Sequence, residues 1–217
     1  LKLDATTIAS IFAGKINKWN APAIKALNPG ANLPSSSIAT VHRSDSSGTS
    51  GAFTEYLSKT APSVWTFGSN KTWPGPGGTG AKGSDGVTAT VSQTSGAIGY
   101  AEVSYAVGAN LPVVQVKNAS GAFTSPKVAS AVAATLAGVT IGPAGALTIN
   151  YDTMNPAAYP IATPTYVVAL KSGGSPLVKD FILYAVTQGQ SSADQLFYAP
   201  LPQNLVSFAE QAINSMT

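Results

Sequence analysis

Short apolar segments typical of β-strands alternate with short helices along this chain of 217 residues, and that alternation most constrains its fold. We predict strands at residues 38–42, 97–101, 112–116 and 161–170, the last being the strongest candidate. We predict helices at residues 4–14, 22–27, 53–57, 85–93, 127–136, 176–187 and 201–216, the first of them capped by Asp4. Strands that alternate with helices favour a mostly parallel sheet covered by helices, so the sequence predicts an α/β fold.

The composition excludes several kinds of chemistry. Cysteine is absent and there is one histidine, His42, which rules out a thiolate nucleophile, an iron–sulfur cluster and a zinc site built from Cys and His. The net charge of +3 comes from scattered lysines, which is too diffuse for a nucleic-acid surface. The longest apolar stretches fall short of the ~20 residues that a membrane-spanning helix needs. We therefore expect no cofactor, no metal and no nucleic-acid partner.

The sharpest local signal is Arg43, the only arginine, together with the six residues that follow it. This segment opens a predicted helix, and the N-terminus of a helix favours an anion through free N–H groups and the helix dipole. Gly48 would let an anion approach the backbone, while Ser47 and Thr49 add hydroxyl donors. Arg43 offers a planar pair of donors that Asp45 is placed to hold by a salt bridge. The segment predicts an anion site, and simple helix capping by a serine is the alternative.

Two other motifs favour an ordinary structural role. Residues 75–80 match G-x-G-x-x-G, but Pro74 and Pro76 disturb the strand-to-helix turn that a dinucleotide site needs, so a loop is the preferred interpretation. A serine hydrolase that uses Ser47 with His42 is also disfavoured, because no G-x-S-x-G pattern surrounds the serines near His42. We expect a structural or solvent-facing role for His42.

Motifs spread over nearly the whole chain match one protein family in order. The matching stretches are residues 3–4, 11–20 (IFAGKINKWN), 23–24, 27–30, 41–50 (VHRSDSSGTS), 53–54, 56–57, 73–74, 80–87 (GAKGSDGV), 96–100 (GAIGY), 105–106, 159–161 and 198–202 (YAPLP). Together they resemble the substrate-binding protein of the bacterial phosphate ABC transporter. That family is periplasmic or extracytoplasmic, and any lipid anchor would lie upstream of Leu1.

The resemblance implies a two-lobed, type II-like periplasmic-binding-protein fold that closes on one phosphate without catalysis. It implies that phosphate contacts Arg43, Ser47, Gly48 and Thr49, with Asp45 pairing to Arg43. An ABC permease in the membrane is the implied partner. High-affinity phosphate binding for delivery to that permease is therefore the expected function. Binding of another oxyanion, and a phosphate-binding module with an adhesion or inhibitor role, are the alternatives.

The chain departs from the family at its start, because Leu1 aligns after a first-lobe segment that contributes further phosphate contacts. We therefore expect residues 1–159 to form the second lobe and residues 160–217 to be the C-terminal return segment of the first lobe. The apolar edge at residues 161–170 would then lack its partner strands. We expect a second chain or fragment to supply the missing segment non-covalently.

Overall fold

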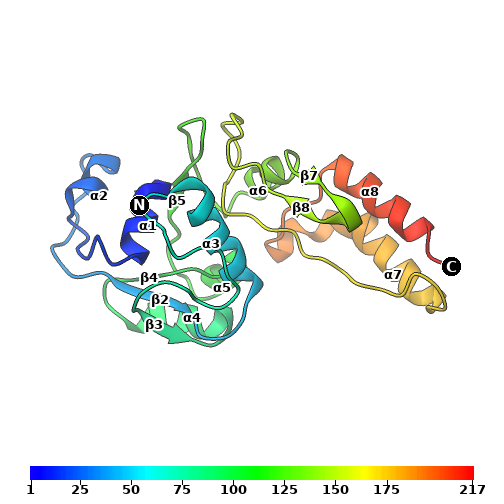
Figure 1. The fold of residues 1–217 in the computed structure, drawn as a ribbon, viewed down its shortest axis with the longest axis horizontal. Helices are drawn as coiled ribbons and strands as arrows, with labels where there is room; N and C mark the ends of the chain where they lie inside the picture. The colour runs from blue at the N-terminus through cyan, green and yellow to red at the C-terminus, as the bar shows by residue number, and fades with distance from the viewer.

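The structure is a computed structural model, and it describes residues 1–143 and 145–217 together with the backbone of residue 144. Figure 1 shows an N-terminal body that carries α1 to α5, linked through a narrow region to a C-terminal body that carries α7 and α8. Strands alternate with helices in the N-terminal body, and most strand pairs there are parallel. The predicted α/β class is confirmed.

A parallel sheet positions the candidate site. Strand β2 (Ala39–Arg43) lies between β3 (Thr79–Ala81) and β4 (Ala97–Gly99). Each strand is followed by a helix, namely α3 (Gly48–Thr60), α4 (Gly83–Gln93) and α5 (Val103–Gly108). The carboxyl ends of the strands and the N-termini of the helices therefore meet at one edge of the sheet. Ligands of open α/β sheets bind at this edge, where neighbouring strands lead to different helices.

A second sheet completes the N-terminal body. Strand β1 (Lys2–Leu3) pairs in parallel with β5 (Gln115–Lys117), which pairs antiparallel with β6 (Phe123–Thr124). Helix α1 (Ala5–Phe12) begins at Asp4, whose carboxylate accepts the Thr7 N–H at 2.8 Å, as predicted, and α2 (Pro22–Leu27) follows. Apolar side chains from both sheets and from α1 and α3 form one buried core, among them Leu3, Ile8, Phe12, Phe53, Leu57 and Trp65.

The C-terminal body is mostly helical. Helix α6 (Ala129–Leu136) leads to the hairpin of β7 (Thr140–Ile141) and β8 (Leu147–Thr148), with the short 3-10 helix η1 (Pro143–Gly145) between them. Helices α7 (Pro176–Val186) and α8 (Gln203–Asn214) pack on each other and are joined through η2 (Gln188–Ser192) and η3 (Asp194–Leu196). The hairpin lies beside α8 in Figure 1, and a Cβ built at Gly145 would lie 3.1 Å from the Phe208 ring. The division of lobes at residue 159 remains a proposal.

The strongest strand candidate, residues 161–170, is not a strand in the structure, so that prediction was wrong. Val168 is 93% exposed and Leu170 is 70% exposed. A strand is defined by hydrogen bonds to a neighbouring strand, and the described part of the chain places none beside this segment. The β-branched composition of this segment is typical of a strand, but no described strand pairs with it.

The segment just before it is firmly held. The buried Asn118 amide donates to the carbonyls of Asn155, Pro156 and Ala158 at 3.3, 3.1 and 2.9 Å. The Thr135 hydroxyl donates to the Tyr159 carbonyl at 2.6 Å. Residues 155–159 are thus held by Asn118 of the N-terminal body and by Thr135 of α6, and the exposed part of the chain begins after Ala162.

Candidate anion-binding site

Arg43, the last residue of β2, forms the expected salt bridge with Asp45. Its Nε donates to Asp45 Oδ1 at 2.8 Å and its Nη2 to Oδ2 at 2.6 Å, with 12% of the Arg43 side chain and 32% of the Asp45 side chain exposed. The hydrogen bonds to the guanidinium hold the pKa of Asp45 well below its usual range, and the same bonds raise the pKa of Arg43. Asp45 uses one edge of the guanidinium, so the Nη1 hydrogens on the other edge remain available for a ligand.

Asp45 also fixes a second element. Its Oδ1 accepts the backbone N–H of Gly83 at 3.2 Å, in the first turn of α4. Asp45 therefore ties the end of β2 to the N-terminus of α4. That double attachment holds the Arg43 guanidinium in one orientation.

Ser47 is the N-cap of α3, so the capping interpretation holds. Its Oγ accepts the Thr49 N–H at 3.1 Å, and its own N–H donates to the Lys71 carbonyl at 2.9 Å. Capping uses the oxygen as an acceptor and leaves the hydroxyl hydrogen free to donate. Capping and anion binding are therefore compatible at Ser47.

Gly48 faces open space. A Cβ built on it would meet nothing within 4 Å, and its φ lies outside the left-handed region. Neither the backbone nor a neighbouring side chain requires glycine at this position. The space above Gly48 is where an anion would reach the Gly48 N–H at the start of α3, whereas the Thr49 N–H is already bound by the Ser47 cap.

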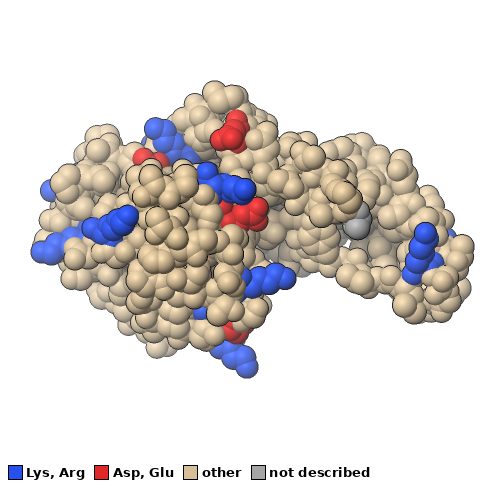
Figure 2. Space-filling model, in the orientation of Figure 1, with Lys and Arg blue, Asp and Glu red and all other residues tan. Residues whose placement is uncertain are grey.

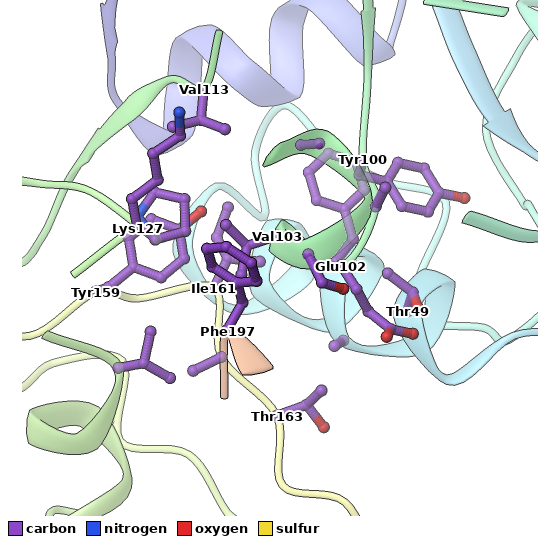
Figure 3. Close-up of a pocket in the computed structure, with 18 of the residues that line it drawn as sticks. Thr49, Tyr100, Glu102, Val103, Val113, Lys127, Tyr159, Ile161, Thr163 and Phe197 are labelled. Atoms are coloured by element: carbon purple, nitrogen blue, oxygen red, sulfur yellow. The ribbon is translucent and has the colours of Figure 1, made fainter. Parts of the chain in front are cut away.

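The candidate residues share one wall of a cavity of about 1740 Å³, which Arg43, Ser47, Gly48 and Thr49 all line. Figure 3 shows the Thr49 side chain close to Glu102 and Tyr100, with Thr163 and Phe197 of the C-terminal segment on another side. A cavity of this size is far larger than a single oxyanion. The four predicted residues therefore line one wall of a cavity that a single oxyanion would not fill.

Two cavity residues were not predicted as part of the site. Tyr100 and Glu102 follow β4 and line the same cavity. Glu102 adds a minor electrostatic contribution that raises the pKa of Arg43. The rule that ligands bind at the carboxyl ends of neighbouring strands could have pointed to both residues.

The other sequence motifs stay outside the site. The glycines at 75–80 come before β3 for the most part, so no strand leads into them as a dinucleotide site requires. The His42 ring stacks on Trp73 at 5.0 Å, and its Nδ1 lies 3.0 Å from the Arg43 carbonyl. His42 is absent from the described cavity lining. It therefore belongs to an aromatic cluster, in agreement with its expected structural role.

Other binding classes find little support in the part of the chain that the structure describes. There, no three His, Asp or Glu side chains lie close enough together to hold a metal ion. Among the described helices, none has the length and apolarity to cross a bilayer. Figure 2 shows lysines dispersed among acidic residues on the visible face of the N-terminal body, without a large patch of one sign.

Comparison with known proteins agrees with the fold. The model of the PBP superfamily domain matches residues 1–188. The chain is 38% identical over 212 residues to the phosphate-binding protein PstS of Pasteurella multocida, covering 95% of this chain and 61% of that protein. It is 34% identical to the phosphate-binding protein PstS 2 of Mycobacterium tuberculosis, covering 100% of this chain and 61% of that protein. The chain thus spans about three fifths of the length of these relatives.

Solved structures support the same fold. A crystal structure of a DING protein superposes with a TM-score of 0.69 at 23% identity, covering 97% of this chain and 66% of that one. A periplasmic phosphate-binding protein, PfluDING, bound with phosphate, gives a TM-score of 0.67 at 21% identity and covers 65% of its chain. These similarities extend over almost all of the present chain.

Proposed function

The chain belongs to the PBP superfamily, and we propose that it forms the larger part of a receptor that binds inorganic phosphate and catalyses no reaction. The observation that carries the proposal is the pairing of an oriented Arg43 guanidinium with open space above Gly48, on the wall of a large cavity. The printed function of the relatives at 34–38% identity, phosphate binding, supports phosphate as the ligand.

Each residue contributes a distinct donor. The free edge of the Arg43 guanidinium provides charge-assisted hydrogen bonds, and the Gly48 N–H adds a donor aligned with the dipole of α3. The hydroxyls of Ser47 and Thr49 complete this half of the site. The role of Asp45 is to orient Arg43, since its carboxylate would repel an anion if it were not already paired.

The pH dependence follows from the low pKa of Asp45. A carboxyl whose pKa is depressed by folding contributes its stabilisation above its ordinary pKa, ~3.9, and loses it as the pH falls through the depressed value. The Arg43–Asp45 pair is therefore intact throughout the range from pH 5 to 9. Any change of phosphate affinity in that range arises from the ligand or from other groups.

The receptor delivers its ligand to an ABC-type permease and works outside the cytoplasm. A second polypeptide completes the first lobe, to which residues 160–217 belong. This polypeptide corresponds to the portion of the PstS relatives that the present chain does not match. Support comes from the exposed apolar residues between 166 and 170 and from the chain's coverage of 61% of the relatives. We expect co-expression of the chain with that portion of the Pasteurella multocida protein to give a one-to-one complex in native mass spectrometry. Two separate species would contradict this part of the proposal.

The binding proposal is tested by two substitutions. Gly48→Ala introduces a methyl group that meets no protein atom, so the fold should keep its stability while the anion loses its approach. Arg43→Ala removes the charged donor, and the loss of ~1.5–3 kcal/mol corresponds to about 10- to 150-fold weaker binding. Titration of inorganic phosphate and of sulfate, followed by NMR, detects binding even in the millimolar range.

The matched control is Gly86→Ala, in the first turn of α4, where a new Cβ would make ordinary contact with Ala81 at 3.7 Å. We expect this variant to bind phosphate like the unmodified chain. Equal phosphate affinity in Gly48→Ala, Arg43→Ala and the control would refute the site. Tighter binding of sulfate than of phosphate would instead identify another oxyanion as the ligand.

A further inference from the structure

We propose that Tyr100 is the positioning residue of the anion site, whose hydroxyl holds both ends of the segment that carries the anion donors. The inference rests on the proposed function for the identity of the ligand. It concerns a residue that lies on a different strand, outside the Arg43–Thr49 motif.

The hydroxyl of Tyr100 joins two elements. Its Oη accepts the backbone N–H of Arg43 at 3.1 Å, at the end of β2. The same oxygen lies 2.7 Å from Oγ of Ser50, in the first turn of α3. Ser50 is fully buried, so its hydroxyl has no access to a ligand or to solvent. One oxygen therefore connects the residue before the loop to the residue just after Thr49.

The ring of Tyr100 is held as firmly as its hydroxyl. It stacks on Phe53 of α3 with a centroid distance of 4.6 Å and on Trp73 at 5.8 Å, while Phe12 of α1 lies at 6.2 Å. Only 8% of the residue is exposed. A ring packed on several sides cannot follow a moving loop, so the loop must adopt the position that the hydroxyl dictates.

Burial also keeps the Tyr100 hydroxyl protonated. Desolvation raises its pKa, and the hydrogen bonds with the Ser50 hydroxyl and with the Arg43 N–H oppose that effect. A neutral hydroxyl both accepts and donates, which lets it serve Arg43 and Ser50 at the same time. The link is therefore constant across the physiological pH range.

The position of Tyr100 follows from the topology. It comes directly after β4, which pairs with β2 in the register Val41 to Gly99. The residue that follows Gly99 therefore lies beside the end of β2, where the anion segment begins. A side chain of this length at that point can reach the backbone of Arg43 and the first turn of α3 together.

The test compares Tyr100→Phe with Tyr56→Phe. The first variant keeps the ring and removes the hydroxyl that positions the loop. The second removes a buried hydroxyl from α3 that has no hydrogen-bond partner in the described part of the chain. We expect Tyr100→Phe to bind inorganic phosphate about 3- to 10-fold more weakly, the range of one buried hydrogen bond. Tyr56→Phe should bind with unchanged affinity.

Amide hydrogen exchange without phosphate gives an independent readout. Tyr100→Phe should speed exchange at Arg43 and in residues 47–50, and leave the amides of β5 unchanged. A double variant with Ser50→Ala should weaken phosphate binding no more than Tyr100→Phe alone, because both changes break one link. Faster exchange throughout the N-terminal body would show a merely structural role and overturn the proposal.

Different results would contradict the proposed phosphate binding and the positioning role of Tyr100. Absence of phosphate binding by the unmodified chain would overturn the proposed function, while the exchange experiment would still decide whether Tyr100 holds the segment. Equal affinity and equal exchange in Tyr100→Phe and Tyr56→Phe would overturn the inference about Tyr100 and leave the proposed function intact.

Discussion

Residues 1–159 bury most of their large apolar side chains, whereas residues 160–217 leave many of theirs exposed to solvent. In the first region Leu3, Leu57 and Trp65 are almost completely buried. In the second, the exposed apolar residues are Tyr166, Val167, Val168, Leu170, Leu177, Val178, Phe181, Tyr184, Leu196, Phe197 and Tyr198. Large exposed apolar patches on a protein commonly mark interaction surfaces. The first region closes its own core, whereas the second leaves many apolar side chains exposed, as the proposed second polypeptide would require.

The comparison also bears on the proposed anion site. All four predicted donors sit on the region that closes its own core, where Asp45 and Tyr100 hold them from two sides. The C-terminal region contributes the opposite side of the cavity through residues such as Thr163 and Phe197. A rigid wall can present donors in a fixed geometry before the ligand arrives, which lowers the entropy lost on binding.

The largest effect that we expect is a difference in the free energy of unfolding between two leucine-to-alanine variants, one in each region. Leu57→Ala in α3 deletes a side chain with 0% exposure and should lower the free energy of unfolding by about 2–5 kcal/mol. Leu177→Ala in α7 changes a side chain that is 75% exposed and should cost less than about 0.5 kcal/mol. Urea unfolding measures both, and equal losses would contradict the contrast between the two regions.

The next effect concerns the boundary between the regions. Asn118→Ala removes the amide that binds the carbonyls of Asn155, Pro156 and Ala158. Leaving these acceptors without their donor should cost about 1–3 kcal/mol in the free energy of unfolding. The exposed Asn204 provides the control, since Asn204→Ala should be close to neutral. Trypsin should also cut the Asn118 variant faster than the control, and equal stability of the two would show that residues 155–159 are held by other contacts.

The sequence predicted those parts of the fold in which the interacting residues lie close together in the chain. The Asp4 cap, helix 22–27 and the Arg43–Asp45 pair were all predictable, because each depends on neighbours close in the chain. The strand at residues 161–170 was not, since a strand needs a neighbouring strand to pair with, and composition alone does not show whether one is present. Tyr100 was missed for a related reason: its hydroxyl meets Arg43 and Ser50, which are distant in sequence, only after β4 pairs with β2.

A smaller effect is expected in alkaline solution. Burial raises the pKa of Tyr56, Tyr151 and Tyr159, all in the first region. A group whose pKa is raised by folding contributes its stabilisation below its ordinary pKa, ~10 for tyrosine, and loses it as the pH rises toward the folded value. The free energy of unfolding should therefore be flat below pH ~9 and fall above pH ~10, with the buried Tyr159 contributing less than ~1.4 kcal/mol of that fall per pH unit. Tyr159→Phe should reduce that slope, and an unchanged slope would show that this residue is not involved.

The smallest change in stability is expected for Val168→Lys, which should nevertheless weaken complex formation with the second polypeptide. Val168 is 93% exposed, so Val168→Lys should alter the free energy of unfolding of the chain by no more than about 0.5 kcal/mol. Pairing of residues 161–170 with a second polypeptide would bury this side chain, and a lysine there would lose apolar burial worth ~1.5–3 kcal/mol and carry a charge into the interface. Native mass spectrometry with the unmatched portion of the Pasteurella multocida protein should then show at least tenfold weaker complex formation. Val128→Lys, at a valine 49% exposed near the start of α6, serves as the control. Equal complex formation by the two variants would mean that the second polypeptide binds elsewhere, and that the exposed segment has another role.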